Sequence, residues 1–170
     1  AWARHNIKAI IQKLDEEGHH VVYSDTDSIF VRSPVAEGSP SVLREDDDQE
    51  TIDAYEAAKQ AMIDFGLEVA QRYSKDSAVL EYEKGLSVFF SHGAKKRYVG
   101  QVVYPSEEML IRGYETQRTD SFEYLTTAMK QMFQFALNDE RDALIQHALE
   151  TVSAVKKHEV PARRLILAKS

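Results

Sequence analysis

Two aspartates, Asp25 and Asp27, stand two positions apart between apolar runs at residues 21–23 and 28–31. β-Branched and aromatic residues on both sides of a polar centre predict a tight hairpin with an acidic tip. On an extended backbone, side chains two positions apart project to the same face, roughly 6–7 Å from each other. Such a pair suits one or two hard cations, because neighbouring like charges need a cation or hydrogen-bond donors to compensate them.

Other interpretations of this pair can be compared with the residues around it. Asp is common in turns, so an ordinary turn stays open as an alternative. A calcium loop of the EF-hand type is excluded, because it would need an oxygen donor, a glycine and a glutamate where the chain has Ile29, Phe30 and Ala36. The chain has no cysteine, so oxygen or imidazole would have to hold a metal, and its six histidines lack metal-ligand spacing.

Helices and strands must position the acidic hairpin. Apolar residues at helical spacing predict a helix over residues 2–17, ended by Gly18, and a long amphipathic helix over residues 51–74. Short apolar runs separated by glycines predict an antiparallel meander of strands at 79–83, 86–90 and 98–104, with a further strand at 110–114. Helices are expected at 122–137 and 139–157, and a last strand at 165–167. The expected fold class is α+β.

Length and composition agree with a globular domain. The chain has 170 residues, 43% of them hydrophobic, and no apolar run as long as the 18–20 residues that a membrane span needs, so no membrane partner is expected. The net charge of −7, taken as an average, disfavours a nucleic-acid partner, but residues 37–53 alone hold seven acids and one base. The rest of the chain is nearly neutral. The absence of cysteine suggests an intracellular protein.

The hairpin resembles a known motif. The run Tyr23-Ser24-Asp25-Thr26-Asp27-Ser28 resembles the Tyr-Gly-Asp-Thr-Asp-Ser hairpin in the palm of family B (polymerase alpha-like) DNA polymerases, with Ser24 where glycine is usual. Two later segments agree in order. Lys95-Lys96-Arg97-Tyr98-Val99-Gly100 resembles the family's Lys-Lys-Arg-Tyr-x-Gly element, and Leu80-Glu81-Tyr82-Glu83 resembles the strand before it.

A fourth segment resembles the family's entry into the thumb. Residues 112–120 are similar to its Arg-Gly-x-Glu-x-x-Arg-Arg-Asp run, with departures at Thr119, where a second Arg is usual, and at Ser121, where Trp is usual. The resemblance covers nearly the whole chain and is closest to archaeal-type members. It implies an antiparallel palm sheet with packed helices at 1–115, the C-terminal part of the palm, and the beginning of a helical thumb at 116–170.

The resemblance implies an enzyme, a DNA-directed DNA polymerase. In this reaction the primer 3′-hydroxyl attacks the α-phosphate of a deoxynucleoside triphosphate and pyrophosphate leaves. Two Mg²⁺ about 3.5–4 Å apart serve the attacking and leaving oxygens. By resemblance Asp27 is the direct metal ligand and Asp25 a supporting one, with Glu83, or alternatively Glu81, near the metals on an adjacent strand. A solvated strand face is the alternative for both glutamates. Nucleotide contacts are implied for Tyr23 and Thr26.

Primer-template DNA is the implied macromolecular partner. Lys95, Lys96 and Tyr98 resemble the residues that grip the primer strand, and Arg118 is an implied phosphate contact at the thumb boundary. Lysine neutralises phosphates with little demand on direction, and tyrosine adds a hydroxyl donor. Residues 156–170 are also basic, as a duplex-gripping thumb would be. A basic surface triplet and an ordinary basic helix end remain the alternatives.

Several parts of such a polymerase are absent from the 170 residues. A second catalytic Asp in an Asp-x-x-Ser-Leu-Tyr-Pro-Ser element, the fingers signature and an exonuclease domain have no match here. We therefore expect the chain to be inactive alone and to need the remaining polymerase portion or a larger polymerase subunit, which would complete the Mg²⁺ site. The implied location is cytoplasmic and nucleoid-associated.

Two other functions stay open. A non-catalytic palm-like subunit would share the fold, although the retained pair of Asp25 and Asp27 favours catalysis. A nucleotide-sugar glycosyltransferase also uses an Asp-x-Asp motif, but it needs a series of βα units before the motif, and only 24 residues precede Asp25.

Overall fold

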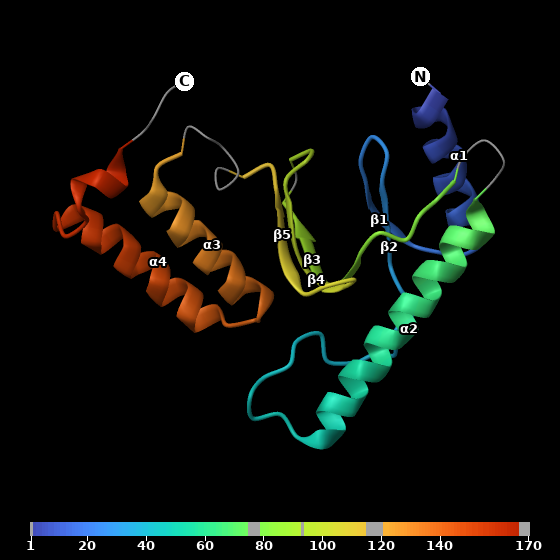
Figure 1. The fold of residues 1–170 in the computed structure, drawn as a ribbon, viewed down its shortest axis with the longest axis horizontal. Coiled ribbons are helices and arrows are strands. Elements are labelled where there is room, and N and C mark those ends of the chain that lie inside the picture. Colours follow the sequence, from blue (N-terminus) through green and yellow to red (C-terminus); the bar gives the residue numbers. More distant parts are fainter. Residues whose placement is uncertain (1, 75–78, 93, 115–120, 167–170) are drawn as a thin grey trace. The chain divides into compact units, whose positions relative to one another are not determined.

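The computed structural model describes residues 2–74, 79–92, 94–114 and 121–166, without the side chains of residues 2–5. Within these residues it is an α+β fold in which ten elements follow one another (Figure 1). They are α1 (Trp2–Glu16), β1 (Val21–Ser24), β2 (Ile29–Val31), α2 (Gln49–Tyr73), β3 (Gly85–Ser91), β4 (Tyr98–Tyr104), β5 (Glu108–Arg112), α3 (Glu123–Leu137), α4 (Arg141–Lys156) and the 3₁₀ helix η2 (Ala162–Leu165). Within the described residues, no helix has the length and apolar character needed to cross a membrane.

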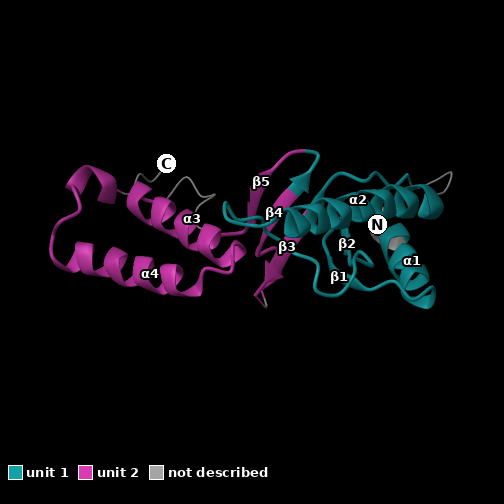
Figure 2. Ribbon diagram, turned by 90° about the horizontal axis from the view of Figure 1, so that it is seen from below, with its two compact units in different colours: residues 1–85, 103–105 teal, residues 86–102, 106–170 magenta. Residues whose placement is uncertain are grey.

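The strands form two small antiparallel sheets. β1 and β2 make one, and β3, β4 and β5 make the other in that order. β4 pairs with β5 through Tyr98 opposite Arg112 and Val99 opposite Ile111. The chain also divides into two compact units, residues 1–85 with 103–105, and residues 86–102 with 106–170 (Figure 2). These units concern packing within the chain, and the expected palm and thumb boundary at 115/116 stays a prediction.

The first unit is built around one apolar cluster that joins both of its helices to the hairpin. Leu14 of α1 and Val69 and Tyr73 of α2 are buried together. Side chains of β1, β2 and the segment after α2 pack against them: Val21, Ile29, Val31 and Leu80. The hairpin is thus fixed at its base by two helices. The expected helix at 2–17 is confirmed, and Gly18 ends it with φ +83°.

Helix α2 begins inside the acidic segment. Asp48 is its N-cap, and the side-chain Oδ1 of Asp48 accepts a hydrogen bond from the backbone N–H of Thr51 at 2.8 Å. This backbone hydrogen bond lowers the pKa of the Asp48 carboxyl. One position earlier, Asp47 Oδ2 accepts a hydrogen bond from the backbone N–H of Arg44 at 2.7 Å. At least two of the acids in this segment therefore serve local structure.

The second unit packs a sheet against a helix. Val99 of β4, Ile111 of β5 and Leu137 of α3 form its buried centre, with Phe90 and Phe133 among the side chains around them. α3 and α4 form an antiparallel helical pair, in which the Tyr124 hydroxyl donates to the Thr151 carbonyl at 2.9 Å. The predicted strands at 86–90, 98–104 and 110–114 and both predicted helices are confirmed to within two residues at their ends.

Two predicted strands are wrong. Residues 79–83 form no strand, because the Ser74 side chain takes the place of a strand partner: the Leu80 N–H donates to Ser74 Oγ at 2.8 Å, and Ser74 Oγ donates to the Ala70 carbonyl at 2.7 Å. The expected strand at 165–167 is replaced by η2, which ends at Leu165. Ile166 belongs to no helix or strand, and residue 167 lies outside the described residues.

Candidate metal-binding hairpin and basic turn

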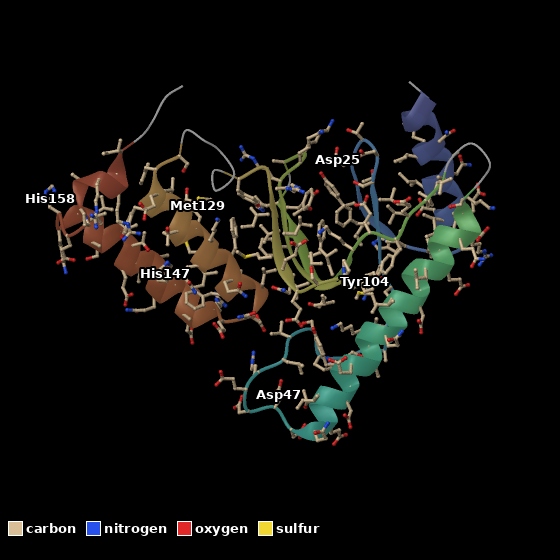
Figure 3. The ribbon with its side chains drawn as sticks, in the orientation of Figure 1. Asp25, Asp47, Tyr104, Met129, His147 and His158 are labelled. Atoms are coloured by element: carbon tan, nitrogen blue, oxygen red, sulfur yellow. The ribbon has the colours of Figure 1, made fainter. Side chains whose placement is uncertain are left out.

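The acidic hairpin has its predicted form. Ser24 pairs with Ile29, and the Asp25 N–H donates to the Ser28 carbonyl at 2.9 Å, so Thr26 and Asp27 occupy the tip. Asp25 is half-buried, and Asp27 is exposed. Figure 3 labels Asp25 at the end of the hairpin loop. The tip therefore presents one well-held and one accessible carboxylate.

The two carboxylates do not have the strand geometry that the sequence suggested. Thr26 and Asp27 lie in a bend, so the rule that places alternate side chains on one face of an extended strand does not apply between Asp25 and Asp27. Instead, Asp25 Oδ1 accepts hydrogen bonds from the Thr26 N–H at 2.7 Å and from the Thr26 hydroxyl at 3.2 Å. Thr26 thus orients the Asp25 carboxylate. Its predicted contact with nucleotide stays a prediction.

An aromatic pair and a β-bulge set the direction of the tip. Tyr23 of β1 and Phe30 of β2 are paired across the hairpin, with ring centroids 5.5 Å apart and planes at 77°. Between Val21 and Tyr23 the register shifts, which leaves Val22 as the extra residue of a bulge, 44% exposed. A bulge bends its strand and increases the local twist. The nucleotide role expected for Tyr23 is untested, and the structure gives this residue a packing role.

A charged cluster at the base of the hairpin was missed by sequence reasoning. The Tyr73 hydroxyl donates a hydrogen bond to Glu17 Oε2, and Arg72 forms an ion pair with the same oxygen at 2.9 Å. The hydrogen bond from Tyr73, helped by Arg72 and Lys13, lowers the pKa of Glu17. Burial, followed by that hydrogen bond, raises the pKa of Tyr73. This cluster joins the end of α1 to the end of α2.

Glu81 and Glu83 lie on an irregular segment and not on a strand. Both are exposed, on either side of the inward-facing Tyr82. Among the described residues, no group of three or more histidines, aspartates or glutamates is arranged to hold a metal ion. The structure therefore does not join Glu83 to Asp25 and Asp27 in a three-ligand set, and the metal role of Glu83 stays a prediction.

The inward-facing Tyr82 is tightly enclosed. Its ring stacks on Tyr104 and lies against Gly66 of α2, where an added Cβ would be 2.3 Å from Tyr82 Cε2. Burial raises the pKa of Tyr82 to about 12. The sequence drew attention to residues 80–83 because of their two glutamates. In the structure it is instead the tyrosine between them that packs into the protein.

The predicted DNA contacts lie in the second unit. Lys95 and Lys96 are exposed in the turn between β3 and β4, which we call the basic turn (residues 94–97). Tyr98, at the start of β4, is only 8% exposed, and its ring centroid lies 5.7 Å from that of Phe89. The lysines are thus accessible to a polyanion, and little of the Tyr98 surface is. Contacts of all three with DNA stay predictions.

The basic C-terminal region is only partly available. Lys156, Lys157 and Arg163 are exposed. Arg164 is held by α3 instead: its Nε lies 3.2 Å from Glu123 Oε1, and its guanidinium lies 5.5 Å from the centroid of the Tyr124 ring. Arg118, the predicted phosphate contact, and Lys169 lie outside the described residues.

The chain is thus an α+β protein that carries an acidic hairpin in one compact unit and a basic turn in the other. No protein-family profile matches the chain. Over nearly its whole length, however, the chain is distantly similar to archaeal family B DNA polymerases.

The similarity extends to three curated proteins. DNA polymerase 2 of Aeropyrum pernix is 25% identical over 171 residues, which cover 100% of this chain and 18% of that protein. The DNA polymerase of Thermococcus kodakarensis is 27% identical over 98% of this chain and 9% of its own length. That of Thermococcus gorgonarius is 24% identical over 98% of the chain and 19% of its own length. The chain thus spans less than a fifth of each relative.

Proposed function

We propose that this chain is the C-terminal palm and first thumb segment of a DNA-directed DNA polymerase, with residues 1–115 and 116–170 in those two roles. The observation that carries the proposal is the acidic hairpin, held by a packed core, in a chain similar to archaeal DNA polymerases over nearly all its residues. The other 80% or more of such a polymerase would supply the missing catalytic parts.

The hairpin fits a divalent cation as a partial ligand set. Mg²⁺ is usually bound through one or two carboxylates, with substrate phosphates and waters completing its shell. Asp27, exposed at the tip, would be the direct ligand, and Asp25, oriented by Thr26, the supporting one. When bound, the metal ions would stabilise charge on the attacking and leaving oxygens of nucleotidyl transfer. A further carboxylate would come from outside this chain, and Glu83 is an additional candidate.

The basic turn would hold the primer strand. Lys95 and Lys96 are exposed, as charges that neutralise phosphates must be, and Tyr98 would anchor the end of the turn in the sheet. Exposed Lys156, Lys157 and Arg163, with Arg118, would add backbone contacts at the thumb. These contacts position the duplex without reading its sequence.

The catalytic part is tested by transplantation. The chain replaces the matched segment of the Thermococcus kodakarensis DNA polymerase, and primer extension is measured with Mg²⁺. We expect Asp27→Asn to abolish extension and Asp46→Asn, in the exposed acidic segment, to leave it unchanged. Unchanged extension with Asp27→Asn would favour a non-catalytic palm-like subunit. Primer extension by the purified chain alone would refute its dependence on a missing portion.

A second measurement does not depend on how well the transplanted segment fits. Mn²⁺, as a paramagnetic substitute for Mg²⁺, should broaden the backbone NMR signals of residues 24–28 in the full chain. Asp27→Asn should remove this broadening, and Asp46→Asn should not. Equal broadening in both variants would mean that Asp27 is not a ligand of the ion. If Mn²⁺ did not broaden these signals even in the unmodified chain, the hairpin would be an ordinary turn with no cation site.

The DNA-binding part is tested on the full chain. We expect the double variant Lys95→Ala/Lys96→Ala to weaken binding of primer-template DNA. The slope of log affinity against log salt should fall by about 1 for each phosphate that a lysine no longer neutralises. Lys8→Ala, on the exposed face of α1, is the matched control. If both variants change the slope equally, the basic turn is ordinary charged surface.

A further inference from the structure

The basic turn and the residue after β5 approach each other unusually closely. The turn is closed by a hydrogen bond from the Arg97 N–H to the Ala94 carbonyl at 3.2 Å, and Lys96 has a left-handed backbone with φ 64°. Gly113, directly after β5, also has a positive φ of 73°. Because Tyr98 pairs with Arg112, the residues just outside this pair, Arg97 and Gly113, face each other at the end of the sheet.

The space at Gly113 is too small for any side chain. An added Cβ would lie 2.1 Å from the Lys96 carbonyl oxygen, 2.9 Å from the Lys96 carbonyl carbon and 2.9 Å from Arg97 Cγ. The nearest atoms belong to backbone, so a change of rotamer cannot relieve the clash. A side chain at 113 would have to displace the carbonyl of Lys96 and therefore the turn that carries both lysines.

Three other glycines give a comparison. Gly18 and Gly38 also have positive φ values, but an added Cβ at either would meet nothing within 4 Å. The clash at Gly113 is therefore distinct from the backbone strain that any side chain suffers at positive φ. At Gly66 an added Cβ meets side-chain atoms of Tyr82. Among these glycines, only Gly113 fits against the backbone of a turn that bears two exposed cations.

We propose that Gly113 is a positioning residue for the basic turn, which it holds in the conformation that presents Lys95 and Lys96 to the sugar-phosphate backbone of DNA. The inference rests on the proposed DNA-binding role of that turn. Gly113 would touch no DNA itself. Because Gly113 has no side chain, the Lys96 carbonyl can lie in the space that a Cβ would occupy. This would fix the backbone positions from which the two lysine side chains extend.

The test is a double-mutant cycle on the full chain, with binding to primer-template DNA measured by fluorescence anisotropy. We expect Gly113→Ala to weaken binding about tenfold at moderate salt, because neither lysine would then reach its phosphate. In the Lys95→Ala/Lys96→Ala background the same substitution should have no further effect. Gly38→Ala should bind like the unmodified chain in both backgrounds.

Three outcomes would overturn the inference. Unchanged binding by Gly113→Ala refutes it directly. An equal loss in both backgrounds means that the substitution damages the fold and not the turn. If Lys95→Ala/Lys96→Ala does not weaken binding, the proposed function of the turn has failed first, and that result is distinguishable because it does not involve Gly113.

A second pair of variants covers the case in which Gly113→Ala does not fold. Lys96→Asn and Lys96→Val remove the same charge, but Asn tolerates a left-handed backbone and β-branched Val does not. We expect Lys96→Val to bind DNA more weakly than Lys96→Asn. Equal binding by the two would show that the turn conformation does not matter and would overturn the role of Gly113.

Discussion

The rings of Tyr82 and Tyr104 stack with their centroids 5.1 Å apart and their planes at 11°. The hydroxyl of Tyr82 is buried, and within the described residues it has no hydrogen-bond partner. An added Cβ at Gly85 would lie 2.3 Å from this oxygen. The stack therefore encloses a polar atom that water cannot reach, which is the cause of the raised pKa of Tyr82, about 12.

Removal of this hydroxyl is expected to stabilise the chain. A buried polar group without a partner costs about 1–3 kcal/mol, so Tyr82→Phe should raise the free energy of unfolding by about 1 kcal/mol while it keeps the stacked ring. Urea unfolding followed by circular dichroism measures the change. Tyr104→Phe is the control on the other ring of the stack, with an expected change near zero. A destabilised Tyr82→Phe variant would mean that the hydroxyl is hydrogen-bonded in solution.

Gly66→Ala is expected to destabilise α2 despite the better helix propensity of alanine. Alanine gains up to about 1 kcal/mol over glycine within a helix, but its Cβ would lie 2.3 Å from a Tyr82 ring that Tyr104 holds in place. Overpacking of this kind costs about 1–3 kcal/mol. The free energy of unfolding should therefore fall. In a Tyr82→Ala background the clash is absent, and Gly66→Ala should become stabilising, a reversal of sign that the same urea titration detects.

The contribution of Glu17 to stability is expected to depend on pH. Its folded-state pKa is lowered from the ordinary value of a glutamate, first by the Tyr73 hydrogen bond and then by Arg72. The stabilisation is present above the unfolded pKa and is lost as the pH falls through the folded pKa. Glu17→Gln should therefore lower the urea midpoint at pH 7, and the difference from the unmodified chain should shrink towards about pH 3.

A neighbouring glutamate provides the control for this experiment. Glu16→Gln removes one negative charge from the preceding position, where the carboxylate accepts a local hydrogen bond from Gln12. Its effect on the urea midpoint at pH 7 should be smaller than that of Glu17→Gln. If Glu17→Gln lowers the midpoint equally at pH 7 and pH 3, the Tyr73 contact carries no ionisation-linked stability.

Arg164 is expected to hold η2 against α3. Its ion pair with Glu123 at 3.2 Å and its position over the Tyr124 ring should together contribute roughly 1 kcal/mol. Arg164→Ala should speed amide hydrogen exchange in residues 162–165 about fivefold and leave exchange in α4 unchanged. Arg163→Ala, which removes an adjacent exposed arginine, is the matched control. Equal protection in both variants would assign the anchoring of η2 to its backbone alone.

The sequence alone predicted correctly those elements whose structure is determined by a local residue pattern. Helical periodicity and Gly18 predicted α1 and its end, and two apolar runs around a polar centre predicted the hairpin. Both depend on residues close together in the chain. The fold class followed from the order of these elements.

Contacts between distant residues explain what sequence reasoning missed. Tyr73 and Glu17 are 56 positions apart, and no sequence pattern around either residue predicts their contact. The strand expected at 79–83 failed because Ser74 satisfies the backbone of Leu80, which periodicity cannot reveal. The geometry of the acidic hairpin was also predicted incompletely. The spacing of Asp25 and Asp27 predicted a shared strand face, whereas the bend at Thr26 gives the two carboxylates different surroundings.

The direction in which the acidic tip projects depends on the one extra residue, Val22, in β1. Deletion of the single codon for Val22 would keep Val21 opposite Val31 and Tyr23 opposite Phe30, but it would straighten the strand that the bulge bends. The same Asp-Thr-Asp triplet would then project in another direction. Two homologues with identical residues at the tip, but with one residue more or fewer three positions upstream, would therefore direct their carboxylates differently. The presence of this extra residue is as informative for comparing such proteins as the motif itself.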